Sequence, residues 1–178
     1  MKKIEIEIPD GKRAEWVNGV LTLVDEKPKD VTERIKTFED AVKELGEKHP
    51  LVAEYSSILC LSHDHEAYLK LRIVCAALNE GWQPKFTKDE LRYYPIFGLY
   101  TKRNLENMSE EEKKGLVMID TGDYDTEYAV FAYAYSIDVP SFAYANIGYR
   151  LCLKSEALAT YCGKQFIDLW ADYLLRRK

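Results

Sequence analysis

A run of alternating large and small side chains, Ala129 to Ile137, restricts the fold of this chain more than any other feature. Such alternation predicts a β-strand, because successive side chains of a strand point to opposite faces of the sheet. Phe131, Tyr133 and Tyr135 then share one face. The opposite face carries the smaller residues Val130, Ala132, Ala134 and Ser136. A chain of 178 residues that combines such a strand with the helical segments described below is expected to fold as one mixed α+β domain.

A β-hairpin is expected within residues 1–27. The segment Lys3 to Ile8 alternates with period two, so its isoleucines share one face. The dipeptide Asn18-Gly19 then joins Glu15–Val17 to Val20–Val24. Asn-Gly is favoured in two-residue hairpin turns, because both positions of such a turn require positive φ.

Residues 30–80 are expected to be helical. A first helix from about Val31 to Leu45 is predicted by apolar residues at helical spacing, namely Ile35, Phe38, Val42 and Leu45. Its end signals are Asp30 as the N-cap, Glu33 at the capping-box position and Gly46 as the stop. A second helix is expected from about Asp64 to Asn79. The piece between them, Leu51 to Leu61, fits no single pattern.

Residues 81–153 are expected to form an aromatic-rich small antiparallel sheet with loops, and residues 154–178 a long C-terminal helix. Thr87 with Glu90 predicts a single helical turn, and Ser109 with Glu112 a capping box before a short charged helix. The apolar run Leu116 to Ile119 predicts a buried strand. The C-terminal helix is capped by Ser155, and its expected core face consists of Leu158, Cys162, Phe166, Leu169 and Tyr173.

Composition limits the classes of function. The formal net charge is -5 at pH 7, which argues against nucleic acid as a partner, because phosphate binding needs clustered Lys and Arg. The start of the chain, MKKIEIEIPD, has no apolar segment of a signal peptide, and no apolar run reaches membrane-spanning length. The four cysteines form no C-x-x-C pair and are expected to be buried free thiols of a reducing compartment: Cys60, Cys75, Cys152 and Cys162.

No catalytic motif is present, so neither enzyme activity nor a cofactor is predicted. The cluster His63-Asp64-His65-Glu66 has the residue types of a metal site but not the helical spacing, and the start of a solvated helix is favoured instead. Four acidic residues near one another lack the pattern of a calcium loop and are interpreted as surface-loop acids: Asp120, Asp123, Asp125 and Glu127.

Three segments resemble an uncharacterised protein family of gut Bacteroidetes phages and integrated mobile elements. They are DVTERIKTFEDAVKELG (30–46), YLKLRIVCAALNEGWQP with a downstream RYYPIF (68–97), and NIGYRLCLKSEALATYCGKQFIDLWADYLL (146–175). The resemblance covers most of the chain and implies an origin more than an activity. It implies a location in the cytoplasm of the host cell or in a virion.

A second likeness concerns the stretch from Gly122 through Ile147-Gly148-Tyr149-Arg150-Leu151. It resembles the C-terminal part of C-type-lectin-like domains of the formylglycine-generating-enzyme type, in which a polar aromatic loop region precedes an I-G-F-R-L strand. The resemblance implies a core strand over Ile147 to Leu153 and a rigid scaffold with a variable ligand-binding surface. The chain departs from the pattern by lacking the G-G-S-W motif and the catalytic cysteines, and by continuing into a long helix.

The sequence as a whole predicts a noncatalytic binding module that uses the tyrosine-rich stretch as its surface, because tyrosine combines a large contact area with a polar tip. The ligand is expected to be a protein or a glycan, and the expected contacts are Asp123, Tyr124, Asp125, Glu127, Tyr128, Tyr133, Tyr135, Asp138, Phe142, Tyr144 and Asn146. The same aromatics would instead fill the core of a small sheet if they faced inward. Two other functions stay open: a phage structural or assembly protein whose aromatic face joins a homo-oligomer, and a small accessory enzyme or inhibitor of host defence.

Overall fold

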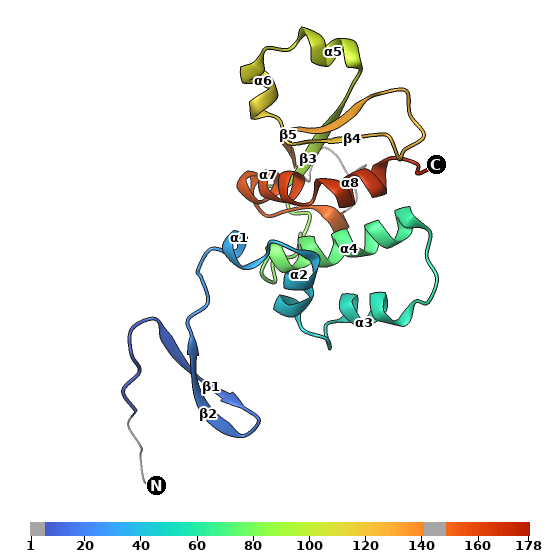
Figure 1. The fold of residues 1–178 in the computed structure, drawn as a ribbon. Coiled ribbons are helices and arrows are strands. Elements are labelled where there is room, and N and C mark those ends of the chain that lie inside the picture. Colours follow the sequence, from blue (N-terminus) through green and yellow to red (C-terminus); the bar gives the residue numbers. More distant parts are fainter. Residues whose placement is uncertain (1–5, 141–148) are drawn as a thin grey trace.

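The computed structural model describes residues 6–140 and 149–178 and has a mixed α+β fold, as predicted. Figure 1 shows an N-terminal hairpin that stands apart from a layered body. In the body, the two C-terminal helices lie between a small sheet on one side and the helices of residues 31–78 on the other. The helices of the described part are all too short or too polar to cross a membrane.

The hairpin consists of β1 (Lys12–Val17) and β2 (Val20–Asp25), which pair antiparallel. Asn18 and Gly19 have φ angles of 51° and 81°, so both adopt the left-handed conformation that a two-residue turn requires. The prediction of a hairpin around this dipeptide is confirmed. Both faces of the hairpin are open to solvent, and Trp16 is 71% exposed.

The helical part contains α1 (Val31–Arg34), α2 (Phe38–Leu45), α3 (Pro50–Ser57) and α4 (His63–Leu78). The expected single helix from Val31 to Leu45 is wrong, because Thr37 caps a new helix in a capping box with Asp40. Asp30 caps α1 by accepting a hydrogen bond from the Thr32 N–H, and Gly46 ends α2 with a φ of 83°. Glu33 lies in the first turn of α1. The capping box stands at the start of α2 instead, between Thr37 and Asp40.

Helix α4 is the centre of the core. Its bounds differ by one residue at each end from the predicted Asp64 to Asn79. Buried residues occur on most of its circumference, because it packs against α2 and α3 on one side and against α8 on the other. At its end, the Asn79 side chain donates to the Cys152 carbonyl (2.8 Å) and accepts from the Lys154 N–H (2.9 Å). Asn79 therefore joins α4 to a segment more than seventy residues later.

The sheet has the order β3-β5-β4 and is antiparallel, with β3 (Leu91–Tyr100), β4 (Met118–Asp120) and β5 (Val130–Pro140). The strand predicted over Leu116 to Ile119 is confirmed from Met118 onward, but its predicted burial is wrong, because β4 lies at an edge and Met118 is exposed. Two short helices precede it, α5 (Lys102–Asn107) and α6 (Glu110–Gly115). Ser109 and Glu112 form the predicted capping box of α6. Thr87 and Glu90 form only a turn, in which the Glu90 carboxylate accepts from the N–H groups of Lys85 and Phe86.

A β-bulge divides β5 into two halves and reverses the side of the sheet to which successive side chains point. Phe97 is paired with Tyr133 and Ile96 with Tyr135, so Ala134 is the extra residue. The alternation of the sequence is therefore broken at Ala134: Tyr133 is only 7% exposed, whereas Tyr135 is 57% exposed. The expectation that Phe131, Tyr133 and Tyr135 share one face is wrong for Tyr135.

The C-terminal part contains a 3₁₀ turn, η1 (Tyr149–Leu151), followed by α7 (Glu156–Gln165) and α8 (Ile167–Leu174). The expected single helix is broken at Phe166, which has non-helical dihedral angles, although Ser155 caps α7 as predicted. The strand expected over Ile147 to Leu153 is wrong for its described residues, which form η1 and a single bridge from Leu153 to Tyr93. Of the predicted core face, Leu158, Cys162 and Phe166 are buried, whereas Tyr173 is 36% exposed.

Three of the four cysteines are buried and all four are free, but Cys60 is exposed, which corrects the expectation that every thiol is buried. Burial raises the pKa of Cys152 to about 11. A hydrogen bond with Cys162, together with burial, raises the pKa of Cys75 well above its usual value. The thiols of Cys75 and Cys152 are therefore protonated at neutral pH and behave as small apolar core residues.

Candidate functional site

The structure separates the tyrosines that the sequence places on one surface. Tyr128 and Tyr135 are exposed, but Tyr124 (5% exposed) and Tyr133 belong to the interior, so the surface position expected of these two is wrong. The predicted polar contacts that the structure describes are exposed: Asp123, Asp125, Glu127 and Asp138. The remaining predicted contacts lie outside the described residues: Phe142, Tyr144 and Asn146. A binding role for the exposed members stays a prediction.

Tyr124 is buried because the C-terminal segment covers it. Its hydroxyl donates to Asp172 (2.7 Å), and the Arg177 guanidinium lies 5.7 Å from the centre of its ring. Burial, and then the Asp172 carboxylate, raise the pKa of Tyr124 to about 12. Backbone hydrogen bonds from Asp125 to Arg176 (2.7 Å) and from Lys178 to Asp123 (3.1 Å) fasten the same segment. This part of the tyrosine-rich stretch therefore holds the C-terminal residues against the sheet.

Tyr133 is buried beneath α7 in a cluster of hydroxyl groups. Its hydroxyl donates to Thr160 (3.0 Å), and Ser136 lies 3.1 Å from Tyr133 and 3.2 Å from Thr160. The Lys164 ammonium lies over its ring, 5.2 Å from the centre. These contacts satisfy the polar groups of a packed interface between β5 and α7, and they leave the Tyr133 ring no access to a ligand.

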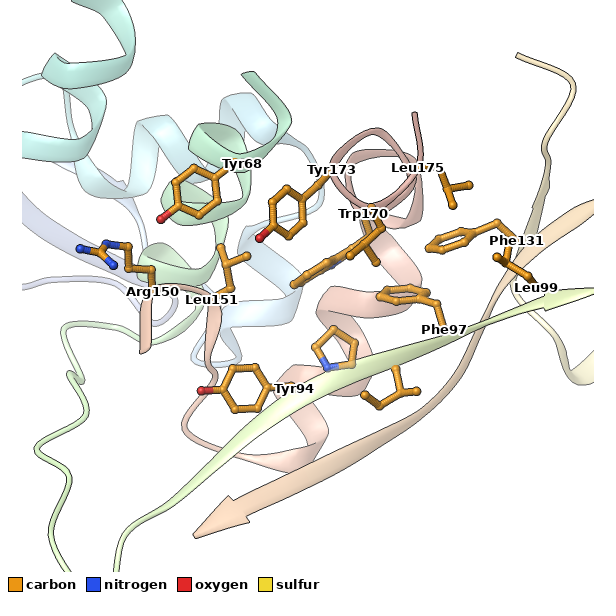
Figure 2. Close-up of a pocket in the computed structure, with 13 residues that line it drawn as sticks. Tyr68, Tyr94, Phe97, Leu99, Phe131, Arg150, Leu151, Trp170, Tyr173 and Leu175 are labelled. Atoms are coloured by element: carbon orange, nitrogen blue, oxygen red, sulfur yellow. The ribbon is translucent and has the colours of Figure 1, made fainter. Parts of the chain in front are cut away.

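A concave site lies elsewhere, between β3, α4, α8 and η1, and has a volume of about 560 Å³. Figure 2 shows the side chains that line it, with Trp170 and Phe97 near the centre. The floor is formed by buried residues: Tyr94, Phe131, Leu151 and Trp170. The rim is more exposed and includes Leu99, Arg150, Tyr173 and Leu174.

Five rings form a continuous row through this cavity, here called the aromatic row: Phe131, Phe97, Trp170, Tyr173 and Tyr68. Phe131 and Phe97 stack with centroids 4.7 Å apart, and Phe97 lies 5.5 Å from Trp170. Trp170 and Tyr173 meet edge to face at 6.3 Å, and Tyr173 stacks on Tyr68 at 5.6 Å. These spacings lie in the range of favourable aromatic pairs, so the row gives the cavity a stiff, apolar wall.

Two polar groups of the floor have distinct environments. Burial raises the pKa of Tyr94 to about 12, so its phenol keeps its proton at neutral pH. The Trp170 indole N–H is buried, and within residues 6–140 and 149–178 it has no hydrogen-bond acceptor. A buried donor without a partner costs free energy, so the favourable contribution of Trp170 at this position comes from its ring and not from its N–H.

Positive charge lies at one end of the cavity. Figure 2 shows Arg150 beyond Leu151, with its guanidinium pointing away from the rings. Its guanidinium lies 4.9 Å from the centre of the Tyr149 ring, and no acidic side chain in the described part of the chain forms an ion pair with it. The Arg72 guanidinium lies 5.7 Å from the Tyr68 ring, but Glu54 neutralises it at 3.0 Å. Arg150 is thus a cation beside an apolar cavity with free capacity for an anion.

Sequence reasoning missed most of this site. A single continuous helix does not place Trp170 in the core, because the break at Phe166 changes which residues of α8 face inward. Within α8, the spacing of Ile167, Trp170 and Ala171 carries the signal, once the helix is read separately. Phe97 and Tyr68 come from distant segments, and no local pattern indicates that they meet.

The His63–Glu66 cluster lies at the first turn of α4, in agreement with the predicted start of a helix. His63, Asp64 and His65 are exposed, and Glu66 pairs with Lys70 at 2.7 Å. Among the residues that the structure describes, no three potential metal ligands are grouped.

Comparison with known proteins yields no match: no family model, no curated protein and no solved structure is similar to the chain.

Proposed function

We propose that the protein is a noncatalytic binding module and that its ligand, a mainly apolar molecule with one anionic group, occupies the cavity beside the aromatic row. The proposal keeps the binding role expected from the sequence but moves the site to a cavity to which the tyrosine-rich stretch contributes Phe131. The observation that carries it is the cavity of about 560 Å³, whose volume is typical of small-molecule sites.

The lining supports binding rather than catalysis. Its described residues include tyrosines and one arginine but no carboxylate, imidazole or thiol. The Tyr94 phenol has a pKa of about 12 and therefore neither gains nor loses a proton near neutral pH. The wall offers contact area, and the aromatic row offers flat faces for an apolar or planar ligand.

Arg150 gives the ligand a direction. An apolar body along the aromatic row would bring a head group at the open end close to the Arg150 guanidinium, which has no acidic partner in the described residues. The side chain is exposed, so water screens the attraction, and an exposed ion pair contributes about 0.2–1 kcal/mol. We therefore expect a carboxylate to bind about 1.4- to fivefold more tightly than the matching alcohol.

The experiment follows the indole N–H signals by NMR while decanoate, or decanol as its uncharged match, is added. The Trp170 signal, assigned with Trp170→Phe, is expected to shift because the indole lies in the floor of the cavity, whereas the signal of Trp16 on the hairpin is expected to stay. Arg150→Gln should remove the preference for decanoate, and Arg103→Gln, an exposed arginine on α5, should preserve it. A Trp170 signal that both ligands leave unmoved would contradict the proposed site.

The origin in gut Bacteroidetes phages or mobile elements, and a location in a host cytoplasm or virion, stay predictions from the resemblance. So does a protein or glycan ligand at the exposed Tyr128 and Tyr135. Binding at this surface and binding in the cavity can be tested separately, because Tyr135→Ser would disturb the surface while leaving the cavity intact.

A further inference from the structure

Among residues 6–140 and 149–178, the hairpin of β1 and β2 is a two-stranded sheet whose two edges pair with no other strand. Isolated two-stranded hairpins are marginal in water, and three or more strands are usually needed for stability. Its apolar side chains are exposed, with Trp16 at 71% and Val20 at 64%. We propose that the free edge of β2 pairs with β2 of a second copy of this chain, so that two hairpins form one four-stranded antiparallel sheet.

The two edges differ in the charge they present. Strand β1 has the sequence KRAEWV, and charged side chains such as Lys12, Arg13 and Glu15 are the usual protection of an edge against pairing. In β2, Val20 to Val24 form an uncharged run of β-branched and apolar residues, VLTLV. Such a run favours strand pairing, so the edge of β2 is the one that is open to a partner.

The backbone of β2 fixes which groups this edge offers. Val17 and Val20 close the two-residue turn, and the Glu26 N–H donates to the Gly11 carbonyl at 2.8 Å. Because hydrogen-bonded pairs alternate along an antiparallel ladder, the even-numbered residues of β2 bond to β1. The N–H and C=O groups of Leu21 and Leu23 therefore point away from β1 and are free to bond to another strand.

A two-fold axis through Thr22 satisfies these groups. Leu21 then lies opposite Leu23 of the second copy, and the two residues exchange both backbone hydrogen bonds. Thr22 lies opposite its own copy in the intervening non-hydrogen-bonded pair. In this register the leucines of both copies share one face and the β-branched residues the other, as side-chain pairing across strands requires.

The charged side chains of the hairpin are compatible with pairing of β2 with β2 of a second copy. On the face that carries Trp16, Leu21 and Leu23, the only charged residues of the hairpin are Lys12 and Asp25, which form an ion pair with each other. Pairing through β2 therefore brings no uncompensated charge against its copy. The edge is also self-complementary, because the two-fold register pairs the free backbone groups of Leu21 with those of Leu23 in a copy, so a second copy of the chain is the occupant proposed.

The first test measures the oligomeric state of the full chain by sedimentation equilibrium between about 1 µM and 1 mM, the range of weak association. The mass is expected to rise toward that of a dimer. Thr22→Lys should weaken the dimer about two- to fivefold, because two like charges then face each other across the axis. Within one hairpin the introduced lysine faces Glu15, so the hairpin itself is not destabilised. A monomer throughout the range would overturn the proposal.

The second test is specific to the register. In a Cys60→Ser background, which removes the exposed native thiol, Thr22→Cys and Val24→Cys are oxidised under identical conditions. Opposed residues at Thr22 have Cα atoms about 4.5 Å apart, within the range of a disulfide, whereas two copies of residue 24 are separated by about 13 Å along the strands. Thr22→Cys is expected to cross-link much faster than Val24→Cys. Equal rates, or a dimer that neither cysteine cross-links, would show that this edge is not the interface.

Discussion

Replacement of Tyr133 or Tyr135 by serine tests the bulge at Ala134, because the two tyrosines are neighbours on one face by sequence pattern but not in the fold. Tyr133→Ser empties a buried site: the ring lies 6.2 Å edge to face from Phe97, and its hydroxyl bond to Thr160 is lost. Truncation of a buried aromatic residue costs about 3–5 kcal/mol. Tyr135 is 57% exposed, so Tyr135→Ser is expected to cost less than about 1 kcal/mol.

The measurement is the free energy of unfolding in urea at 25 °C for the wild type and the two variants. A similar dependence on denaturant concentration among the three proteins would show that the variants unfold as the same cooperative unit. The expected difference between the variants is at least about 2 kcal/mol. Equal losses for Tyr133→Ser and Tyr135→Ser would refute the bulge, since they would mean that both rings occupy the same kind of environment.

Three further predictions concern the packing and titration of the body. Gly163→Ala should destabilise the protein, because a Cβ would lie 2.6 Å from Pro95 and 2.7 Å from Tyr133. The overpacking costs about 1–3 kcal/mol, which exceeds the gain in helix propensity of about 0.5–1 kcal/mol. A higher melting temperature of the variant would contradict this. Trp170→Phe should cost less in urea unfolding than Trp170→Ala, since the indole N–H has no acceptor in the described residues; equal costs would argue against this account. The free energy of unfolding should fall between pH 10 and 12, because Tyr124 retains its proton in the folded state after the unfolded chain has lost it. Tyr124→Phe should make this fall with pH shallower. An unchanged dependence on pH would show that Tyr124 titrates normally.

The elements that the sequence predicts well are those whose signals are local. Asn18-Gly19 determines a turn through the φ angles of two adjacent residues, and Ser109 with Glu112 determines a helix start within four residues. Asp30, Ser155 and Gly46 act in the same way at other helix ends. Each depends on side chains that meet wherever the rest of the chain lies, so no knowledge of the tertiary fold is needed.

The misses come from tertiary packing. The break at Phe166 interrupts an apolar pattern that would continue as one helix, because α7 packs mainly against β3 and β5 and α8 mainly against α4. The break at Thr37 is an exception, because the capping box of Thr37 with Asp40 is a local signal. At Ala134, one extra residue allows Tyr133 to enter the interface with α7 while Tyr135 faces solvent. The aromatic row depends on segments more than seventy residues apart, such as Tyr68 and Trp170, so the candidate site had no local signature.

The contacts of Asn79 have a consequence for synthesis of the chain on the ribosome. Helix α4 is complete once residue 78 has emerged, but the carbonyl of Cys152 and the N–H of Lys154 that satisfy the Asn79 amide come from a much later segment. Helix α8, which covers another side of α4, follows later still. The nascent chain therefore has an apolar helix that only α2 and α3 shield until the last part of the protein is made, and during that interval a chaperone has a defined segment to protect, Leu69 to Leu78.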